Sequence, residues 1–322
     1  MITRIVLITI YLLYAVGAWA QPVPAAEENI PFLVTFGEQA ETSWGDDDFS
    51  QVFFFVVPER VTDPIYIRVF DPECGGEHDE INEEFNTMTR FSVYGGEGCL
   101  SAEASKSTDP VPFHDSGVQL ASKTFGSKGE YDNNWYTFGP FNPIEGEFQP
   151  QHEGYIFKVI CHGIRGDDGN LYRYFMSLNP DDNQPVEGGN AFTFEYTFRL
   201  HPEPWQVSHV YPYIDEAVVS IKQSNFDWDS DGYIKVFSVA TPGTMLEMSK
   251  DDQWIESEYK IQDAERGNSL DIQFVNDDDL TDNNNVVFYI RNQYGELMPF
   301  YTVPIGGVPE YKGFISVKGF KK

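Results

Sequence analysis

The stretch AFTFEYTFRL, residues 191–200, alternates apolar and polar side chains from Phe192 onward. Successive side chains of a β-strand point to opposite faces, so a period of two is typical of a strand with one buried face. The apolar face would carry Phe192, Phe194, Tyr196 and Phe198, and the opposite face Thr193, Glu195, Thr197 and Arg199. The pattern predicts one half-buried β-strand.

Segments of the same kind recur along the chain. They are short, rich in β-branched and aromatic residues, and bounded by Gly, Pro, Asn or Asp. The clearest are QVFFFVVP (51–58), PIYIRVFDP (64–72), TRFSVYGG (89–96), EGYIFKVICHG (153–163), NLYRYFMSL (170–178), YIKVFSVAT (233–241) and NVVFYIRNQYG (285–295). No stretch of a dozen residues keeps a helical period. We therefore expect an all-β chain of antiparallel β-sandwiches.

A proline-rich segment, LHPEPWQVSHVYPY (200–213), marks the expected domain boundary. Pro202, Pro204 and Pro212 cannot donate a ladder hydrogen bond, so they do not suit central strands. We expect a large sandwich of the jelly-roll or C2 kind over residues 21–203 and a smaller immunoglobulin-like sandwich over residues 204–322.

The N-terminus has the layout of a secretory signal peptide. Arg4 precedes an apolar stretch from Ile5 to Val16, and Ala18 and Ala20 supply a small-residue cleavage site. The alternative is a buried strand or a membrane anchor, but the apolar stretch is short for a bilayer. We expect residues 1–20 to be removed and the mature chain to be periplasmic or secreted. No later apolar run is long enough for a membrane span.

The net charge of -30 limits the classes of partner. Nucleic acids and anionic membranes attract basic surfaces, so we expect neither as a partner. Divalent cations fit such a chain better. Three cysteines, Cys74, Cys99 and Cys161, leave two alternatives open. Cys74 and Cys99 would form a disulfide that closes a short loop in an oxidising compartment, or all three stay unpaired and buried.

The turn FDWDSDGYI, residues 226–234, places an aspartate at every second position before a glycine. Calcium loops of the EF-hand type begin in this way, with a backbone carbonyl as the next ligand. The closing glutamate is replaced by Ser238, and strands rather than helices flank the turn. We predict a calcium site in a loop between strands, whose first ligands are Asp227, Asp229, Asp231 and the Tyr233 carbonyl. The bidentate ligand that completes the calcium coordination would come from elsewhere in the chain. The candidates are Asp277, Asp278, Asp279 and Asp282. The alternative is a plain hairpin turn at Asp231 and Gly232.

A second acidic segment, YIRVFDPECGGEHDE (66–80), follows directly from a strand. Acids at the strand ends of a sandwich can gather at one rim, as in calcium-dependent modules of the C2 type. Asp71 and Asp79 are the candidate ligands. Their expected companions are Asp46, Asp47, Asp48, Asp132, Asp167 and Asp168. The alternative is an ordinary hydrophilic loop.

The sequence shows no signature of a catalytic site. A nucleophile elbow, a zinc-protease helix, a phosphate-binding loop and a dinucleotide fingerprint are all missing, and we assign no catalytic residue. Aromatic residues in turns could stack on sugars or on a protein partner, or could fill the ends of the sandwiches. They are Trp44, Trp135, Tyr136, Trp205 and Trp228.

Five segments together resemble an uncharacterised exported module that precedes OmpA-like peptidoglycan-binding domains in Gram-negative envelope proteins. They are FFFVVPER (53–60), YIRVFDPECGGEHDE (66–80), YDNNWYTFGPFNP (131–143), EGGNAFTFEYTFRL (187–200) and NQYGELMPFYTVPIGGVP (292–309). The resemblance implies an envelope or secreted location and a non-enzymatic role. No segment of this chain resembles the OmpA-like domain itself, so cell-wall attachment is not part of the expectation.

The expected role is that of an exported, non-catalytic binding or structural protein stabilised by calcium. Its expected partner is an envelope polysaccharide or a protein. The alternative is a secreted carbohydrate-active enzyme or its sugar-binding subunit, in which acidic loops and turn aromatics would line a cleft.

Overall fold

The computed structural model describes residues 20–108, 116–229, 231–277 and 283–311. Except for Ala20, the expected signal peptide lies outside the described residues. In the part of the chain that the structure describes, no helix is long and apolar enough to cross a membrane.

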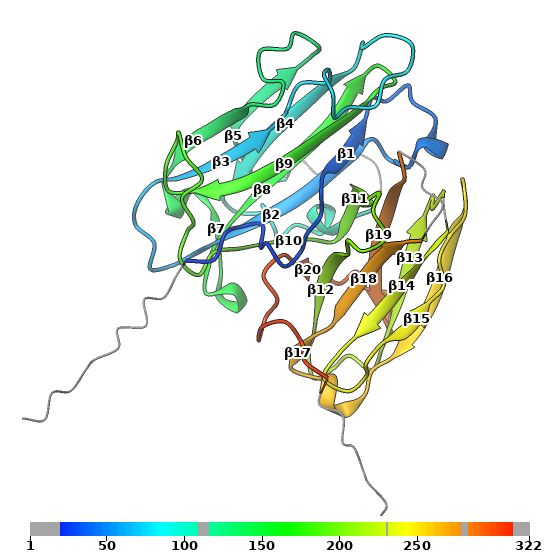
Figure 1. Ribbon diagram of the computed structural model, residues 1–322. Helices are drawn as coiled ribbons and strands as arrows, with labels where there is room; N and C mark the ends of the chain where they lie inside the picture. Colours follow the sequence, from blue (N-terminus) through cyan, green and yellow to red (C-terminus); the bar gives the residue numbers. More distant parts are fainter. Residues whose placement is uncertain (1–19, 109–115, 230, 278–282, 312–322) are drawn as a thin grey trace, which may run out of the picture.

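The chain is all-β, as expected, and its strands form two large antiparallel sheets (Figure 1). One sheet has eight strands. In spatial order they are β16 (Trp254–Lys260), β13 (Ser220–Phe226), β19 (Asn285–Asn292), β11 (Glu195–Arg199), β1 (Leu33–Phe36), β9 (Gly169–Ser177), β3 (Ile65–Phe70) and β6 (Trp135–Phe141).

The other sheet has twelve strands. Its main path runs through β15 (Thr244–Leu246), β14 (Gly232–Phe237), β18 (Asp271–Asn276), β12 (Ser208–Ile214), β20 (Phe300–Tyr301), β10 (Asn190–Thr193), β2 (Ser50–Pro58), β8 (Gly154–Arg165), β4 (Met88–Gly95) and β5 (Val118–Phe125). Beside this path, β17 (Asn268–Ser269) pairs with β12, and β7 (Glu147–Gln149) pairs with β8. The helical turns are short 3-10 segments: η1 (Thr42–Trp44), η2 (Glu103–Lys106), η3 (Pro143–Glu145), η4 (Pro150–His152) and η5 (Asp263–Glu265).

Both sheets cross the boundary expected at residues 203 and 204. In the eight-stranded sheet, β11 pairs with β19 from Glu195↔Tyr289 to Arg199↔Asn285. In the twelve-stranded sheet, β20 pairs with β10 on one side and β12 on the other. The division into two folding units, and their jelly-roll and immunoglobulin-like types, stay predictions.

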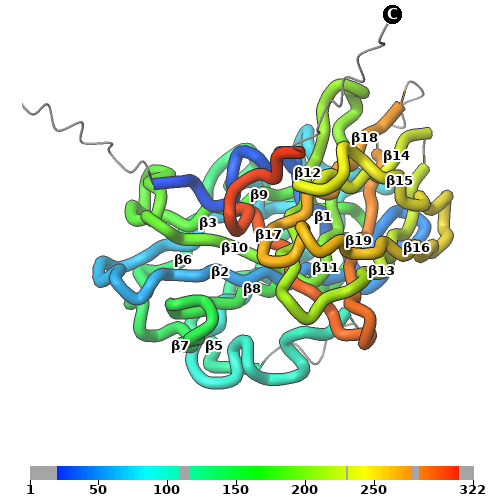
Figure 2. Tube along the Cα trace, turned by 90° about the horizontal axis from the view of Figure 1, so that it is seen from below, coloured from blue at the N-terminus to red at the C-terminus, as the bar shows by residue number. Residues whose placement is uncertain are grey.

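The N-terminal segment adds another connection between the halves. Figure 2 shows this segment, in dark blue, beside the C-terminal segment in red. The backbone N–H of His209, in β12, donates to the carbonyl oxygen of Glu28 at 2.8 Å. On the other side, the N–H of Met176 in β9 donates to the carbonyl of Val23 at 3.0 Å. The segment is thus hydrogen-bonded to strands from both halves.

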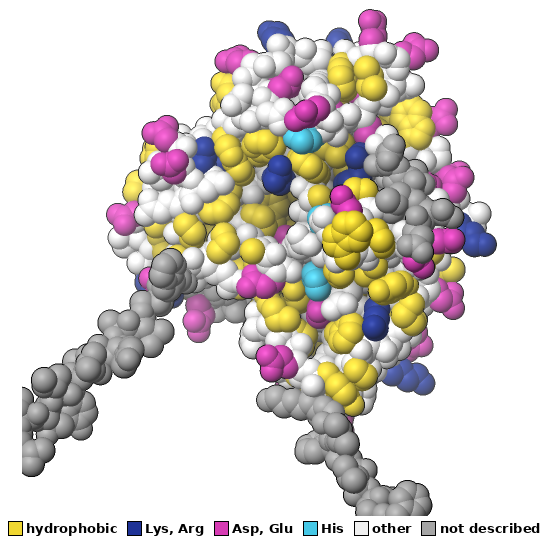
Figure 3. Space-filling view, in the orientation of Figure 1, with side chains coloured by type: hydrophobic (Ala, Val, Ile, Leu, Met, Phe, Trp, Pro, Cys, Tyr) yellow, Lys and Arg dark blue, Asp and Glu magenta, His cyan; other side chains and the backbone are white. Residues whose placement is uncertain are grey.

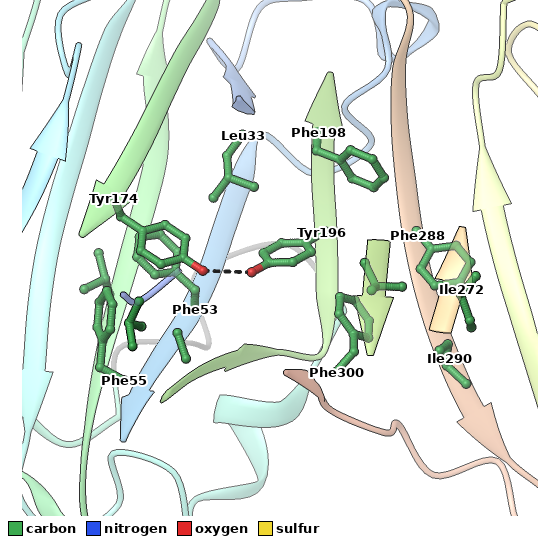
Figure 4. Packing of buried hydrophobic residues seen from close by; sticks show 14 of the residues in the cluster. Leu33, Phe53, Phe55, Tyr174, Tyr196, Phe198, Ile272, Phe288, Ile290 and Phe300 are labelled. Carbon is green, nitrogen blue, oxygen red and sulfur yellow. Dashed lines mark hydrogen bonds between the residues drawn. The ribbon is translucent and has the colours of Figure 1, made fainter. Parts of the chain in front are cut away.

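A hydrophobic core lies between the sheets and continues through both halves (Figure 4). Phe53 and Phe55 of β2 pack against Tyr174 of β9, with ring centroids 4.6 and 5.3 Å apart. The hydroxyl oxygens of Tyr174 and Tyr196 lie 2.9 Å apart, so these buried polar atoms satisfy each other. Phe288 of β19 belongs to the same core. Each fully buried ring contributes about 2 kcal/mol.

The stretch 191–200 forms two strands in different sheets, which corrects the expectation of a single strand. β10 lies in the twelve-stranded sheet and β11 in the eight-stranded sheet, and the chain passes between them at Phe194. Phe192 and Phe194 pack in a separate cluster around Phe54, whereas Tyr196 and Phe198 enter the main core. The alternating pattern therefore holds on each side of the crossing.

All three cysteines are buried and free. Cys161 lies in the main core, and Cys99 belongs to the cluster around Phe54. Of the two alternatives, a Cys74–Cys99 disulfide or three unpaired cysteines, the structure shows the second.

Candidate metal site

The acidic turn at residues 227–231 connects the two sheets. It leaves β13 in the eight-stranded sheet at Phe226 and enters β14 in the twelve-stranded sheet at Gly232. These two strands do not pair, so the hairpin alternative is wrong. The loop from β15 to β16 also crosses between the sheets, and the pairing Phe226↔Trp254 brings its end to the same rim.

Three carboxylates from these two loops lie close together. Asp227, Asp229 and Asp251 each offer an oxygen within 4.8 Å of the others, an arrangement that could hold a metal ion. The Asp227 side chain is fully buried, whereas Asp229 and Asp251 are exposed. Oδ1 of Asp227 accepts from the Asp252 N–H at 2.7 Å. Oδ2 of Asp227 is buried and has no hydrogen-bond partner among the described residues. One buried carboxylate and two exposed ones thus lie close together.

Neighbouring polar side chains fix the two loops against each other. The Trp228 N–H donates to Ser249 Oγ at 3.2 Å, and the Ser249 N–H donates to Asn225 Oδ1 at 2.7 Å. The Asp229 N–H donates to Asn284 Oδ1 at 3.1 Å. The backbone around the carboxylates is therefore held by side chains that are themselves buried.

The electrostatics of this group are unfavourable without a cation. Burial raises the pKa of Asp227 to about 7, and repulsion from Asp229 and Asp251 adds to the shift. Burial, followed by repulsion from Asp251, raises the pKa of Asp229 to about 6. A divalent cation among these oxygens would favour their charged forms and offset the repulsion.

The structure retains part of the predicted ligand set and adds one residue. Asp231 is exposed and does not belong to the close group, and its carbonyl accepts from the Asp277 N–H at 2.8 Å. Tyr233 lies in β14 opposite Val275. Asp278, Asp279 and Asp282 lie outside the described residues. Asp251 was missed, because only the pairing of β13 with β16 brings its loop to the turn.

The candidates in the first half, Asp71 and Asp79, hold loops in place. Oδ1 of Asp71 accepts from the Asn133 N–H at 3.0 Å. The two oxygens of Asp79 accept from the N–H groups of Gly75 and Leu171, each at 2.6 Å. Burial raises the pKa of Asp71 to about 6 and that of Asp79 to about 8. Neither belongs to a group of three carboxylates with oxygens within 4.8 Å among the described residues.

One expected companion has a similar structural role. Asp168 is fully buried, and its carboxylate accepts from the backbone N–H groups of Asn82, Asn86 and Thr87 at 2.9, 2.7 and 3.1 Å. Three backbone donors satisfy this acid without a metal. Asp46 likewise accepts from three backbone N–H groups, those of Phe36, Asp48 and Phe49. Unlike Asp168, it lies in a second close group of three carboxylates, formed with Asp47 and Asp48.

Most of the negative charge is spread over the surface. Figure 3 shows acidic side chains around the outline of one face, while hydrophobic side chains gather in its hollowed centre. Dispersed surface acids are stabilised by water and need no metal. The two close groups, one of Asp227, Asp229 and Asp251 and the other of Asp46, Asp47 and Asp48, are therefore the candidate metal sites.

The turn aromatics do not gather in one patch. Trp228 is buried, Trp205 is 76% exposed, and Trp44, Trp135 and Tyr136 are half-buried. None of the five lines the groove of about 1100 Å³ that separates the 291–299 segment from residues 100–108.

That groove has its own aromatic lining. Tyr294 is 74% exposed, and the ring of His152 stacks on Phe192 with centroids 5.2 Å apart. Tyr213 and Arg291 also line it. Rings and polar side chains together are what a sugar-binding groove requires.

Comparison with known proteins gives no family. No family model matches the chain, and no curated protein matches it. Among solved structures, it is similar to the CUB1-EGF-CUB2 region of human MASP-1/3, with 10% identity over 81% of this chain and 99% of that one, at a TM-score of 0.19. It is also similar to a Parabacteroides distasonis protein provisionally described as secreted, with 10% identity over 88% and 97% of the chains, at a TM-score of 0.19. Scores this low support no conclusion about the site, and the resemblance to the module ahead of OmpA-like domains stays a prediction.

Proposed function

We propose that the chain is an exported, non-catalytic β-sandwich protein of the cell envelope or the extracellular space, stabilised by calcium at the rim site of Asp227, Asp229 and Asp251. The supporting observation is the buried side chain of Asp227, which lies close to two further carboxylates and whose Oδ2 has no partner among the described residues. An isolated buried carboxylate oxygen costs several kcal/mol, and a bound cation removes that cost.

The donor set favours calcium over other metals. All three side chains are carboxylates, whereas zinc prefers nitrogen and sulfur ligands. Calcium accepts six to eight oxygens in flexible geometry and would complete its shell with water on the side of the exposed Asp229 and Asp251. Few protein ligands and an open side suit the weak affinities of extracellular calcium modules, roughly 0.1 to 1 mM.

Thermal unfolding with and without calcium tests the proposal. With a dissociation constant of about 0.1 mM, 1 mM free calcium would stabilise the native state by roughly 1.4 kcal/mol. The melting temperature would rise by a few degrees. Magnesium at the same concentration would give a smaller rise, because it demands a tighter octahedral shell. An unchanged melting curve in calcium would contradict the proposal.

A second candidate function is polysaccharide binding in the groove lined by Tyr213, Arg291 and Tyr294. The exposed Tyr294 ring supports it, because an exposed ring can stack on a sugar. Affinity electrophoresis through gels that contain envelope or plant polysaccharides tests it. We expect retardation that Tyr294→Ala reduces, while Tyr311→Ala, at another exposed tyrosine, leaves it unchanged. Release of soluble sugar from the polymer would instead support the enzyme alternative.

A further inference from the structure

The loop that joins β1 to β2 carries three consecutive acids into the interior. Asp46 is fully buried and Asp48 is 6% exposed. Oδ2 of Asp46 accepts from the Phe36 N–H at 2.8 Å, at the end of β1. Oδ1 of Asp48 accepts from the Ser50 N–H at 2.8 Å, at the start of β2. These two carboxylates therefore lie between one strand of each sheet.

The third acid of this loop leaves one oxygen without a hydrogen bond. Asp46, Asp47 and Asp48 each offer an oxygen within 4.8 Å of the others. Oδ1 of Asp47 is buried and has no partner among the described residues.

A fourth carboxylate comes from the point where the chain changes sheets. Glu195 is the first residue of β11, directly after the crossing at Phe194. Its Oε2 atom is buried and, among the described residues, has no hydrogen-bond partner. Burial raises the pKa of Glu195 well above its usual range, and the charges of Asp48, Asp47 and Asp46 raise it further. Glu195 lies outside the group whose oxygens are within 4.8 Å of one another, but its charge interacts with all three aspartates. Asp47 and Glu195 each carry an oxygen that has no partner among the described residues.

A small cavity, lined by both polar and apolar side chains, lies beside Asp48 and Glu195. It has a volume of about 10 Å³ and is lined by Asp48 and Glu195 together with Ser50, Gln51 and Thr193. A cavity of this size holds roughly one water molecule or one bare ion.

Little positive charge opposes the four acids. The guanidinium of Arg291 lowers the pKa of Glu195, but its Nη1 donates to the Tyr289 hydroxyl at 3.0 Å. One cation against four acids, of which Asp46 and Asp48 are buried and the other two half-buried, leaves most of the negative charge uncompensated.

We propose that Asp46, Asp47, Asp48 and Glu195 form a second calcium site, buried between the sheets and separate from the rim site. All four ligands are hard oxygen donors, as calcium prefers. The ion would connect β1 and β11 of the eight-stranded sheet to β2 of the twelve-stranded sheet. Because the ligands are more numerous and more buried than at the rim, calcium here binds more tightly and exchanges more slowly.

Counting bound calcium in single variants of the full mature chain tests the proposal. In equilibrium dialysis against radioactive calcium, the wild type would bind two ions per chain, and Glu195→Gln and Asp251→Asn would each bind one. The double variant would bind none, and Asp231→Asn would still bind two. Circular dichroism of each variant confirms the fold. If Glu195→Gln does not fold, Asp47→Asn replaces it and would also bind one ion.

The outcomes separate the two sites. A wild type that binds one ion, lost in Asp251→Asn and kept in Glu195→Gln, overturns the buried site and leaves the rim site intact. One ion lost only in Glu195→Gln supports the buried site and contradicts the rim proposal. No bound calcium in the wild type overturns both.

Discussion

At the residue scale, the acidic turn shows what a sequence motif can and cannot specify. The alternating aspartates correctly indicate that Asp227 and Asp229 lie together. The same spacing includes Asp231, but the chain turns into β14 and leaves that side chain exposed. Asp251 could not be predicted, because its proximity depends on the pairing of β13 with β16.

Substituting single carboxylates at the rim site distinguishes the residues that bind the ion from nearby acids that do not. We expect Asp251→Asn to abolish the calcium-dependent rise in melting temperature, because one of the three carboxylates that the described residues bring together loses its charge. Asp231→Asn, in the same loop but outside the group, should keep the full rise. Melting curves at 0 and 1 mM calcium check both variants, and equal loss in both would place the ion elsewhere.

Glu28 provides a prediction about pH that is independent of metal. Its side chain is 4% exposed, and burial raises its pKa to about 8, an effect partly offset by a hydrogen bond from Tyr196. Below about pH 4.5 the acid is protonated in both the folded and unfolded states, so it has no effect on stability. As pH rises towards 8, the unfolded state ionises first, and the folded state becomes relatively less stable.

Glu28→Gln should remove this loss of stability. The variant and the wild type should have similar free energies of unfolding near pH 4.5, and at pH 8 the variant should be more stable by on the order of a few kcal/mol. Urea unfolding at both pH values measures the difference. A constant difference between Glu28→Gln and wild type across this range would refute the assignment.

At the element scale, the sequence predicts strands well and their connections poorly. The alternation in residues 191–200 correctly indicates extended chain, yet it does not reveal that the strand changes sheets at Phe194. The period of two is preserved on both sides of the crossing, so the change leaves no trace in the pattern. Glu195 was accordingly expected on a polar face, whereas the crossing buries its Oε2.

Gln51 joins the sheets next to this crossing, and its removal should be costly. The side chain is 2% exposed, its Nε2 donates to the Glu195 carbonyl at 2.8 Å, and its Oε1 accepts from the Thr197 N–H at 2.8 Å. Gln51→Met leaves the Thr197 N–H without this partner, whereas the Glu195 carbonyl still accepts from Thr193 Oγ1 at 2.6 Å. We therefore expect a destabilisation of about 1 to 3 kcal/mol in urea unfolding. The exposed Gln253→Met should change stability by less than about 0.5 kcal/mol. A loss below 1 kcal/mol for Gln51→Met would mean that the sheets are not joined through this residue.

At the scale of the whole molecule, Pro202, Pro204 and Pro212 suggest a domain boundary. Strands on the two sides of it nevertheless pair with each other. The segment is proline-rich, as a linker would be, but β12 begins at Ser208 and pairs with β18 and β20. Local composition could not reveal this, because the pairings β11–β19 and β10–β20 join residues far apart in the chain. All-β class and antiparallel pairing follow from local pattern, whereas the continuity of the sheets does not.

Shared sheets and a shared core lead us to expect a single cooperative unfolding transition. Separating the halves would expose the edge of β11 along five residue pairs and cut a core that includes Phe53 and Phe288. Exposing this apolar surface costs free energy and so opposes the unfolding of one half alone. Urea unfolding followed by tryptophan fluorescence and by far-ultraviolet circular dichroism should therefore give coincident curves. After removal of residues 1–20 five tryptophans remain, two before the expected boundary and three after it. Circular dichroism instead reports the backbone of all strands, so the two signals weight the halves differently. Two separate midpoints would show that the halves unfold independently despite the hydrogen bonds between them.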